Sequence, residues 1–255
     1  TQGIDSKRGA SGHGQNPFIA LVAPETTEDQ GKVIAANLLY SGNFIGEVTV
    51  DMHQNSRLQL GLNPFEFSWQ LAAGEKFHTP EAVFLTSEAG LNEMSQRFHR
   101  FYQDCVIRSD YRYRPRPVLI NNWEATYFDF DRMKLSAMID SASQLGMELF
   151  VLDDGWFGQR NDDTSSLGDW FPNEKKIGGP LSSLVEEVHD KGLDFGLWVE
   201  PEMVSKDSQL YRQHPEWVVQ VPNRTPQLVR NQYVLDLSNP AVQEYLIATL
   251  SRLFH

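Results

Sequence analysis

The stretch that decides the fold is Leu149–Gly158, with the sequence LFVLDDGWFG. Four apolar residues lead into two adjacent carboxylates, Asp153 and Asp154, and a glycine and two large aromatic residues follow. A short, continuous apolar run bounded by a turn signal is typical of a strand that is buried on both faces. Such strands belong to parallel sheets, so the stretch predicts a parallel sheet with polar groups at its carboxyl edge.

Strand–helix units of the same kind lie on both sides of this stretch. An apolar strand over residues 117–121 precedes a helix that Asp131 caps, and the apolar residues of this helix recur every three or four positions. A second helix begins at Pro180, ends at Gly192 and leads into another apolar strand. A third helix begins at Asn239. Residues 113–255 are therefore predicted to be α/β, either an open sheet or a barrel.

The loops after the strands favour the barrel. An open sheet that binds a nucleotide carries a glycine-rich loop after its first strand, and the corresponding residues 121–128, NNWEATYF, contain no glycine. Each predicted strand ends instead in polar or aromatic residues, as in barrel enzymes. Three units are visible, whereas a closed barrel of this kind has eight.

Residues 17–86 have the pattern of a β domain. Short apolar runs separated by Gly, Pro and Asn predict strands over residues 31–41, 44–52, 65–74 and 81–87. The spacing of the first two predicts a hairpin around Ser41–Asn43. A helix is predicted over residues 89–103, and the prolines that follow it mark a domain boundary, which gives domains 1–112 and 113–255.

Composition narrows the class of partner and location. A net charge of −12 disfavours nucleic acid and an anionic membrane surface as partners. No apolar run approaches the ~20 residues of a membrane span. The single cysteine, Cys105, excludes an internal disulfide framework and fits a cytoplasmic location. The chain lacks an initiator Met and stops inside an apolar helix, so we expect a fragment of a longer protein.

The paired carboxylates have three interpretations. Asp153 and Asp154 beside aromatic faces predict a sugar site, because carboxylate oxygens accept hydrogen bonds from hydroxyls while rings cover the apolar C–H face. A solvated pair that caps the turn is the plain structural alternative. A Mg²⁺ site completed by Glu200 and Glu202 is the third. The seven histidines show no i, i+4 pair, so no zinc site is expected.

Aromatic and basic side chains complete the candidate site. Trp123 and Trp198 follow predicted strands, and with Trp156 they suggest a shared aromatic pocket, although each indole taken singly could equally pack in the core. Arg230 lies in a loop after the third strand, from which it could reach a ligand hydroxyl pair or a carboxylate.

Several stretches resemble the family 36 retaining α-galactosidases, of the bacterial melibiase and raffinase type. In the second half these are NNWEATYFDF, LFVLDDGWFG, FGLWVEPEMV and VLDLSNP, and in the first half RGASGHGQNPF, TTEDQGKV, YSGNF and LGLNPFEFSW. The resemblance implies the C-terminal part of a β-supersandwich followed by the first three βα units of a TIM (β/α)8 barrel. It also implies α-galactosides such as melibiose and raffinose as substrates, no cofactor or metal, and assembly of the full-length protein as a tetramer.

The resemblance also implies roles for individual residues. The carboxylates matching Asp153 and Asp154 hold the 4- and 6-hydroxyls of galactose, the indoles matching Trp123 and Trp198 wall the sugar subsite, and the arginine matching Arg230 borders it. The family's nucleophile lies in a KWDMN motif, which these 255 residues do not contain. No catalytic residue is therefore assigned, and the chain by itself is expected to be inactive.

Two other classes of function remain open from the sequence. A chain complete at 255 residues would be a non-catalytic carbohydrate-binding module. A Mg²⁺-dependent barrel lyase would use Asp154 and Glu200 as metal ligands.

Overall fold

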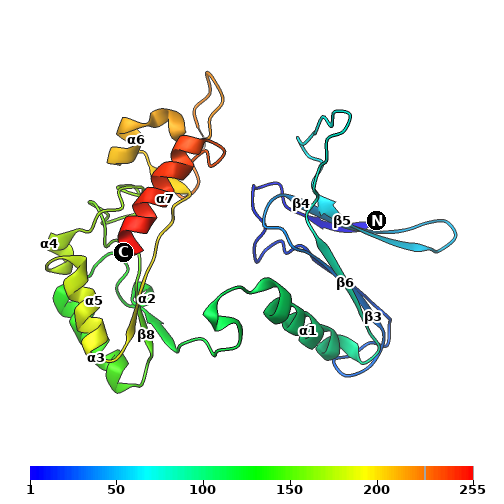
Figure 1. The fold of residues 1–255 in the computed structure, drawn as a ribbon, viewed down its shortest axis with the longest axis horizontal. Coiled ribbons are helices and arrows are strands. Elements are labelled where there is room, and N and C mark those ends of the chain that lie inside the picture. The colour runs from blue at the N-terminus through cyan, green and yellow to red at the C-terminus, as the bar shows by residue number, and fades with distance from the viewer. Residues whose placement is uncertain (227, 255) are drawn as a thin grey trace. The chain divides into compact units, whose positions relative to one another are not determined.

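The computed structural model describes residues 1–226 and 228–254, and the chain divides into two compact units, Thr1–Pro115 and Arg116–His255 (Figure 1). The boundary predicted after residue 112 is close to this division. Antiparallel sheets occupy the first unit, and parallel strands with intervening helices occupy the second, which is the mixed α/β order that the sequence predicts.

The first unit contains two antiparallel sheets of three strands each. One sheet has the order β1-β4-β5 and the other has the order β2-β3-β6. The strands are β1 (Gln2–Asp5), β2 (Phe18–Val22), β3 (Val33–Leu38), β4 (Phe44–Val50), β5 (Ser56–Leu62) and β6 (Ala82–Ser87).

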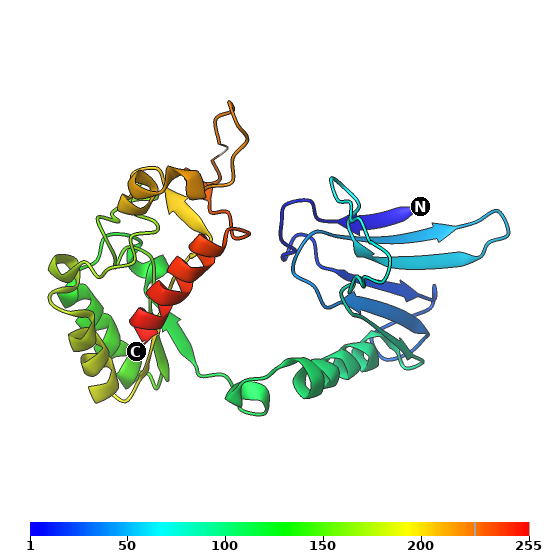
Figure 2. The same cartoon turned by 45° about the horizontal axis from the view of Figure 1, so that its top comes forward.

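A single long helix covers the second of these sheets. α1 (Gly90–Phe101) follows β6 directly and lies along this sheet (Figure 2). Its buried Met94 and Phe98 pack against Val33 and Ala35 of β3. The helix continues as a π-helical turn, η1 (Tyr102–Val106), and a short 3-10 turn, η2 (Asp110–Arg112), completes the unit's helical segments. The helix predicted over residues 89–103 is confirmed.

Two predictions for the first unit are wrong. Residues 65–74 alternate apolar and polar side chains but form no strand, and the partner of β4 is instead β5. An aspartate-nucleated turn joins β4 to β5, because Asp51 accepts hydrogen bonds from the backbone N–H groups of His53 and Asn55. The hairpin expected around Ser41–Asn43 is also absent, because that segment leads from β3 in one sheet to β4 in the other.

The second unit is built on the parallel sheet β7-β8-β9. β7 (Leu119–Asn121) pairs with β8 (Leu149–Leu152), and β8 pairs with β9 (Asp194–Leu197). Phe150 and Leu152, on one face of β8, are fully buried, whereas Leu149 and Val151 on the other face are only partly buried. The pairing of β7, β8 and β9 confirms the three predicted parallel strands, but β8 is not fully buried on both faces as predicted.

Helices α3 (Arg132–Gln144) and α5 (Leu181–Asp190) lie side by side in this unit (Figures 1 and 2). Asp131 caps α3 as predicted, accepting a hydrogen bond from the backbone N–H of Lys134. Arg132 ties the two helices together through Ser183 and Glu187 of α5. The remaining elements are α2 (Trp123–Thr126), α4 (Glu174–Ile177), β10 (Met203–Ser205), α6 (Gln209–Gln213), η3 (Pro215–Trp217), β11 (Gln232–Val234) and α7 (Pro240–Phe254).

Candidate functional site

The carboxyl ends of β7, β8 and β9 bring most of the predicted site residues to one edge of the sheet. The parallel register pairs Asn121 with Val151, and Leu152 with Leu197. Trp123, Asp153 and Trp198 therefore each come within two residues of a strand end at this edge. The structure thus places these three residues, together with Asp154, where the sequence predicted a site.

Two asparagines at the end of β7 fix the position of Asp153. Its backbone N–H donates to Oδ1 of Asn122 over 2.8 Å, and Asn122 is fully buried. The Nδ2 group of Asn121 donates to the carboxylate of Asp153, while Oδ1 of Asn121 accepts from the backbone N–H of Trp123 over 2.7 Å. Asn121 therefore connects the first predicted carboxylate to the first predicted indole, a link that the sequence analysis missed.

The second carboxylate forms a buried ion pair with Arg160. Nε of Arg160 donates to both oxygens of Asp154, at 2.9 and 3.2 Å, and Nη2 donates to Oδ2 at 2.8 Å. The exposed fractions of the two side chains are 1% for Arg160 and 8% for Asp154. The sequence analysis did not identify Arg160. A buried carboxylate at a strand end is nevertheless a signal for such a residue, because a buried charge is costly unless an opposite charge pairs with it.

Lys176 lies next to Arg160 of this ion pair and is partly buried. Its Nζ donates to the backbone carbonyl of Arg160 at 3.2 Å and lies 4.3 Å from the centre of the Phe130 ring. Burial lowers the pKa of Lys176 from 10.5 to about 8, and the charges of Asp154 and Asp129 oppose this shift only in part. The positive charge of Lys176 therefore acts on Asp154 in addition to that of Arg160.

One of the three candidate indoles lies in the core. Trp156 is fully buried and donates its Nε1–H to the carbonyl of Trp198, so it belongs to the core and not to a ligand surface. Trp198 stacks on Phe157, with ring centres 6.5 Å apart. Trp123 packs edge-on against a different ring, that of Phe128, with centres 5.0 Å apart. The prediction that Trp156 lines an aromatic pocket is therefore wrong, because its ring is part of the hydrophobic core.

Arg230 enters the site through an ion pair with Glu200. Its Nη2 donates to Oε1 of Glu200, and the exposed fractions of the two side chains are 64% and 13%. Burial raises the pKa of Glu200, while Arg230 and the more distant Arg160 act in the opposite direction. Glu200 therefore lies within electrostatic reach of the Asp154–Arg160 pair. Arg230 and Asn231 both have left-handed backbone, with φ of 50° and 64°.

These pairings bear on the magnesium interpretation. The carboxylates of Asp154 and Glu200, which would hold the ion, each bind an arginine instead. Within residues 1–226 and 228–254, no group of three or more His, Cys, Asp or Glu side chains has the arrangement of a metal site. Over the same residues, no helix is both long and apolar enough to cross a bilayer.

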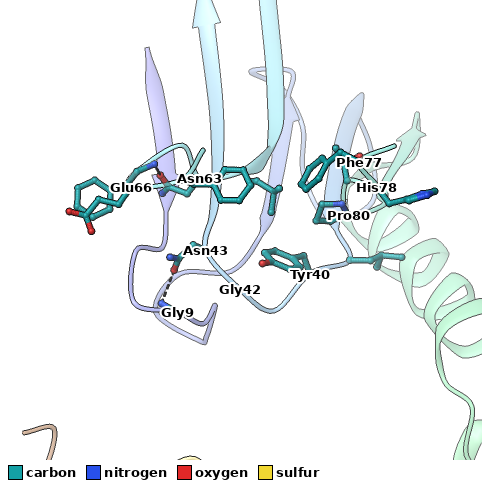
Figure 3. Close-up of a pocket in the computed structure, with 14 residues that line it drawn as sticks. Gly9, Tyr40, Gly42, Asn43, Asn63, Glu66, Phe77, His78 and Pro80 are labelled. Atoms are coloured by element: carbon teal, nitrogen blue, oxygen red, sulfur yellow. Dashed lines mark hydrogen bonds between the residues drawn. The ribbon is translucent and has the colours of Figure 1, made fainter. Parts of the chain in front are cut away.

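A separate hollow of about 610 Å³ lies within the first unit (Figure 3). Tyr40 and Phe77 contribute rings to it, and Asn43 lies at its edge, where its side chain accepts a hydrogen bond from the backbone N–H of Gly9. None of the five predicted site residues lines this hollow.

Comparison with known proteins connects both units to one family. A model described as the glycosyl hydrolase family 36 N-terminal domain matches residues 1–72, and a model described as melibiase matches residues 76–255. The chain is 52% identical over 250 residues to alpha-galactosidase AgaA of Geobacillus stearothermophilus and 48% identical over 252 residues to alpha-galactosidase 1 of Pediococcus pentosaceus. These matches cover 98% and 99% of this chain and 34% of each relative, so the chain spans about a third of their length.

Solved structures show the same relation. The crystal structure of AgaA from G. stearothermophilus matches with a TM-score of 0.96 at 52% identity, covering 99% of this chain and 35% of that chain. A variant of AgaA in complex with stachyose matches with a TM-score of 0.95, at the same identity and coverage. Another AgaA variant, in complex with raffinose, matches with a TM-score of 0.95 at 51% identity, again covering 99% and 35%.

Proposed function

The chain belongs to glycoside hydrolase family 36, and from this premise we propose that the whole protein is a retaining α-galactosidase. It releases terminal α-linked galactose from oligosaccharides such as melibiose and raffinose, and residues 1–255 carry the galactose-binding part. The observation that carries this proposal is the match, at 52% identity and a TM-score of 0.95, to an α-galactosidase structure in complex with stachyose.

The site residues take specific roles in this proposal. Asp153 and Asp154 accept hydrogen bonds from the 4- and 6-hydroxyls of galactose, which separates galactose from glucose through the axial 4-hydroxyl. Trp123 and Trp198 wall the subsite, and Arg230 borders it. The hydrogen bonds of Asp153 and Asp154 support these roles. An ionised carboxylate has about four acceptor positions, and the protein donors occupy only some of them, so the others can accept from sugar hydroxyls.

The proposal also assigns an architecture and a setting. Residues 1–112 form the C-terminal part of a β-supersandwich, and residues 113–255 form the first three βα units of a (β/α)8 barrel. The two antiparallel sheets and the parallel sheet β7-β8-β9 support this assignment. We further propose a cytoplasmic location, with the lone Cys105 in its favour, and tetrameric assembly of the full-length protein.

The reaction itself needs groups that residues 1–255 do not supply in this proposal. Retaining hydrolysis uses one carboxylate as nucleophile and another, about 5–5.5 Å away, as acid and base. The carboxylate of Asp153 accepts a hydrogen bond from Asn121, and that of Asp154 pairs with Arg160. The KWDMN motif does not occur in residues 1–255. We therefore expect residues 1–255 alone to bind α-galactosides without cleaving them.

The test compares the full-length protein with residues 1–255 on a nitrophenyl α-galactoside. Asp153→Asn in the full-length protein should lower kcat/KM about 10- to 100-fold, the value of hydrogen bonds to a charged acceptor. Asp190→Asn changes an exposed carboxylate on α5 and should leave kcat/KM within about twofold of wild type.

Three outcomes contradict parts of the proposal. Cleavage by residues 1–255 would contradict the assignment of catalysis to residues outside them. Equal effects of the two variants would contradict the role of Asp153. A full-length protein that binds galactose without hydrolysing any α-galactoside would favour the carbohydrate-binding module.

A further inference from the structure

Arg160 is the most completely buried charged residue of the candidate site, with an exposed fraction of 1%. It belongs neither to a strand nor to a helix, and it follows Asp154 by six positions in the loop after β8. Its guanidinium binds both carboxylate oxygens of Asp154 in a fork. A fork of two or more hydrogen bonds fixes the plane of a carboxylate as well as its position.

Arg160 is itself held rigidly on its other sides. Nη1 donates to the backbone carbonyl of Ser165 at 3.0 Å, and the guanidinium carbon lies 5.5 Å from the centre of the Phe128 ring. The backbone carbonyl of Arg160 accepts from Lys176 at 3.2 Å. The same Phe128 ring packs against Trp123, so the position of Arg160 is coupled to a predicted wall of the subsite.

We propose that Arg160 is a positioning residue: it orients Asp154 so that the free acceptor positions of the carboxylate face a hydroxyl of the sugar. Arg160 acts through Asp154 and does not touch the sugar. This inference rests on the proposed α-galactosidase function and adds a determinant of substrate recognition to it. Lysine cannot replace arginine here, because an ammonium group is a point charge that cannot form the planar fork.

The competing role for Arg160 is purely structural, as an anchor for the loop over residues 155–165. A structural anchor would affect every substrate to the same extent. A positioning residue affects only the interaction of Asp154 with its hydroxyl, so its loss has little effect on a substrate that lacks this hydroxyl. The two roles are therefore separated by comparing substrates.

The experiment measures kcat/KM of the full-length protein and its Arg160→Lys variant on nitrophenyl α-galactoside and on the 4-deoxy and 6-deoxy analogues. Displacement of a positioned group by about 1 Å costs about 100-fold, so Arg160→Lys should lose about 10- to 100-fold on the galactoside. On the analogue that lacks the hydroxyl bound by Asp154, the loss should be about threefold or less. Arg132→Lys is the matched control, because Arg132 makes a comparable set of bonds between α3 and α5 away from the site.

The readout is a ratio between substrates, which does not depend on the fraction of active enzyme. Arg160→Gln, which retains an amide donor, serves as a second variant if Arg160→Lys does not accumulate in folded form. Equal losses on the galactoside and both deoxy analogues would overturn the positioning role and leave the α-galactosidase assignment intact. A wild-type protein inactive on all α-galactosides would overturn the proposed function and this inference with it.

Discussion

Replacing Asp154 with alanine should destabilise the loop after β8 by about 3–5 kcal/mol, the usual cost of breaking a buried ion pair from one side. The variant would leave a guanidinium that is 1% exposed without its ion-pair partner, although its contacts with the carbonyl of Ser165 and the face of Phe128 would remain. Asp154→Asn retains one acceptor oxygen but loses the charge, so a smaller cost of about 1.5–3 kcal/mol is expected.

Native-state hydrogen exchange on the full-length protein is the appropriate assay, since a multidomain protein has no single free energy of unfolding. The amide of Gly158 is a suitable reporter because it donates to the carbonyl of Phe171 at 2.9 Å, and Gly158 lies in the same loop as Arg160. The double variant Asp154→Ala/Arg160→Met removes both charges and should recover most of the loss.

Asp140→Ala is the matched control for the buried pair. Asp140 pairs with Lys191 where both side chains are nearly half exposed, so its removal should cost less than about 1 kcal/mol. The reasoning fails if Asp154→Ala costs no more than Asp140→Ala. It also fails if the effects of the two substitutions at Asp154 and Arg160 simply add.

Three further predictions concern other residues. Burial lowers the pKa of Lys176 from 10.5 to about 8, so between these pH values the unfolded chain binds more protons than the folded one, and the free energy of unfolding rises with pH. The urea midpoint should therefore rise between pH 8 and pH 10.5 in wild type and not in Lys176→Met. The same pH dependence of the midpoint in both proteins would contradict this. Gly90→Ala should lower the thermal midpoint far more than Gly146→Ala, because both glycines have positive φ but only at Gly90 would a Cβ lie 2.6 Å from backbone atoms; similar shifts would refute this. Glu200→Gln should weaken galactose binding about fivefold through a less ordered Arg230, as measured by calorimetry, and unchanged affinity would remove Arg230 from the subsite.

Local signals account for the parts of the fold that the sequence predicted. Asp131 caps α3 by binding the Lys134 amide, and Gly146 has φ of 75° just after that helix ends. Such signals depend only on neighbouring residues, so they survive any tertiary arrangement. The apolar run of β8 is equally local, and its carboxyl end places Asp153 and Asp154 without further information.

The main error in the first unit arises because two segments show the same pattern and a turn determines which of them forms a strand. Residues 56–62 and 65–74 both alternate apolar and polar side chains, and only the first segment pairs with β4, through the turn that Asp51 forms. In the second segment, Glu66 has a left-handed φ of 49° and Trp69 is 61% exposed. Alternation of apolar and polar side chains therefore does not show which of two segments pairs with a neighbouring strand.

The sequence predicted the site residues that directly follow strands, but not the residues that tertiary structure brings to them. Asp153 follows a strand, which is visible in the sequence, whereas its support by Asn121 depends on the parallel register of β7 and β8. Arg160 lies in a loop without regular structure, and no pattern of spacing directs its side chain back to Asp154. Trp156 follows a strand end, a position from which an indole can face a ligand, but its ring is fully buried in the core.

The distribution of tryptophan gives this chain a built-in optical reporter. Five of its six indoles lie in the second unit, among them Trp156 and Trp170, which are at most 2% exposed. Their emission should shift to longer wavelength when that unit melts. The exposed thiol of Cys105, the one cysteine in the sequence, accepts a maleimide dye in the first unit. Two colours recorded during one temperature ramp would therefore reveal which half of the chain loses its structure first.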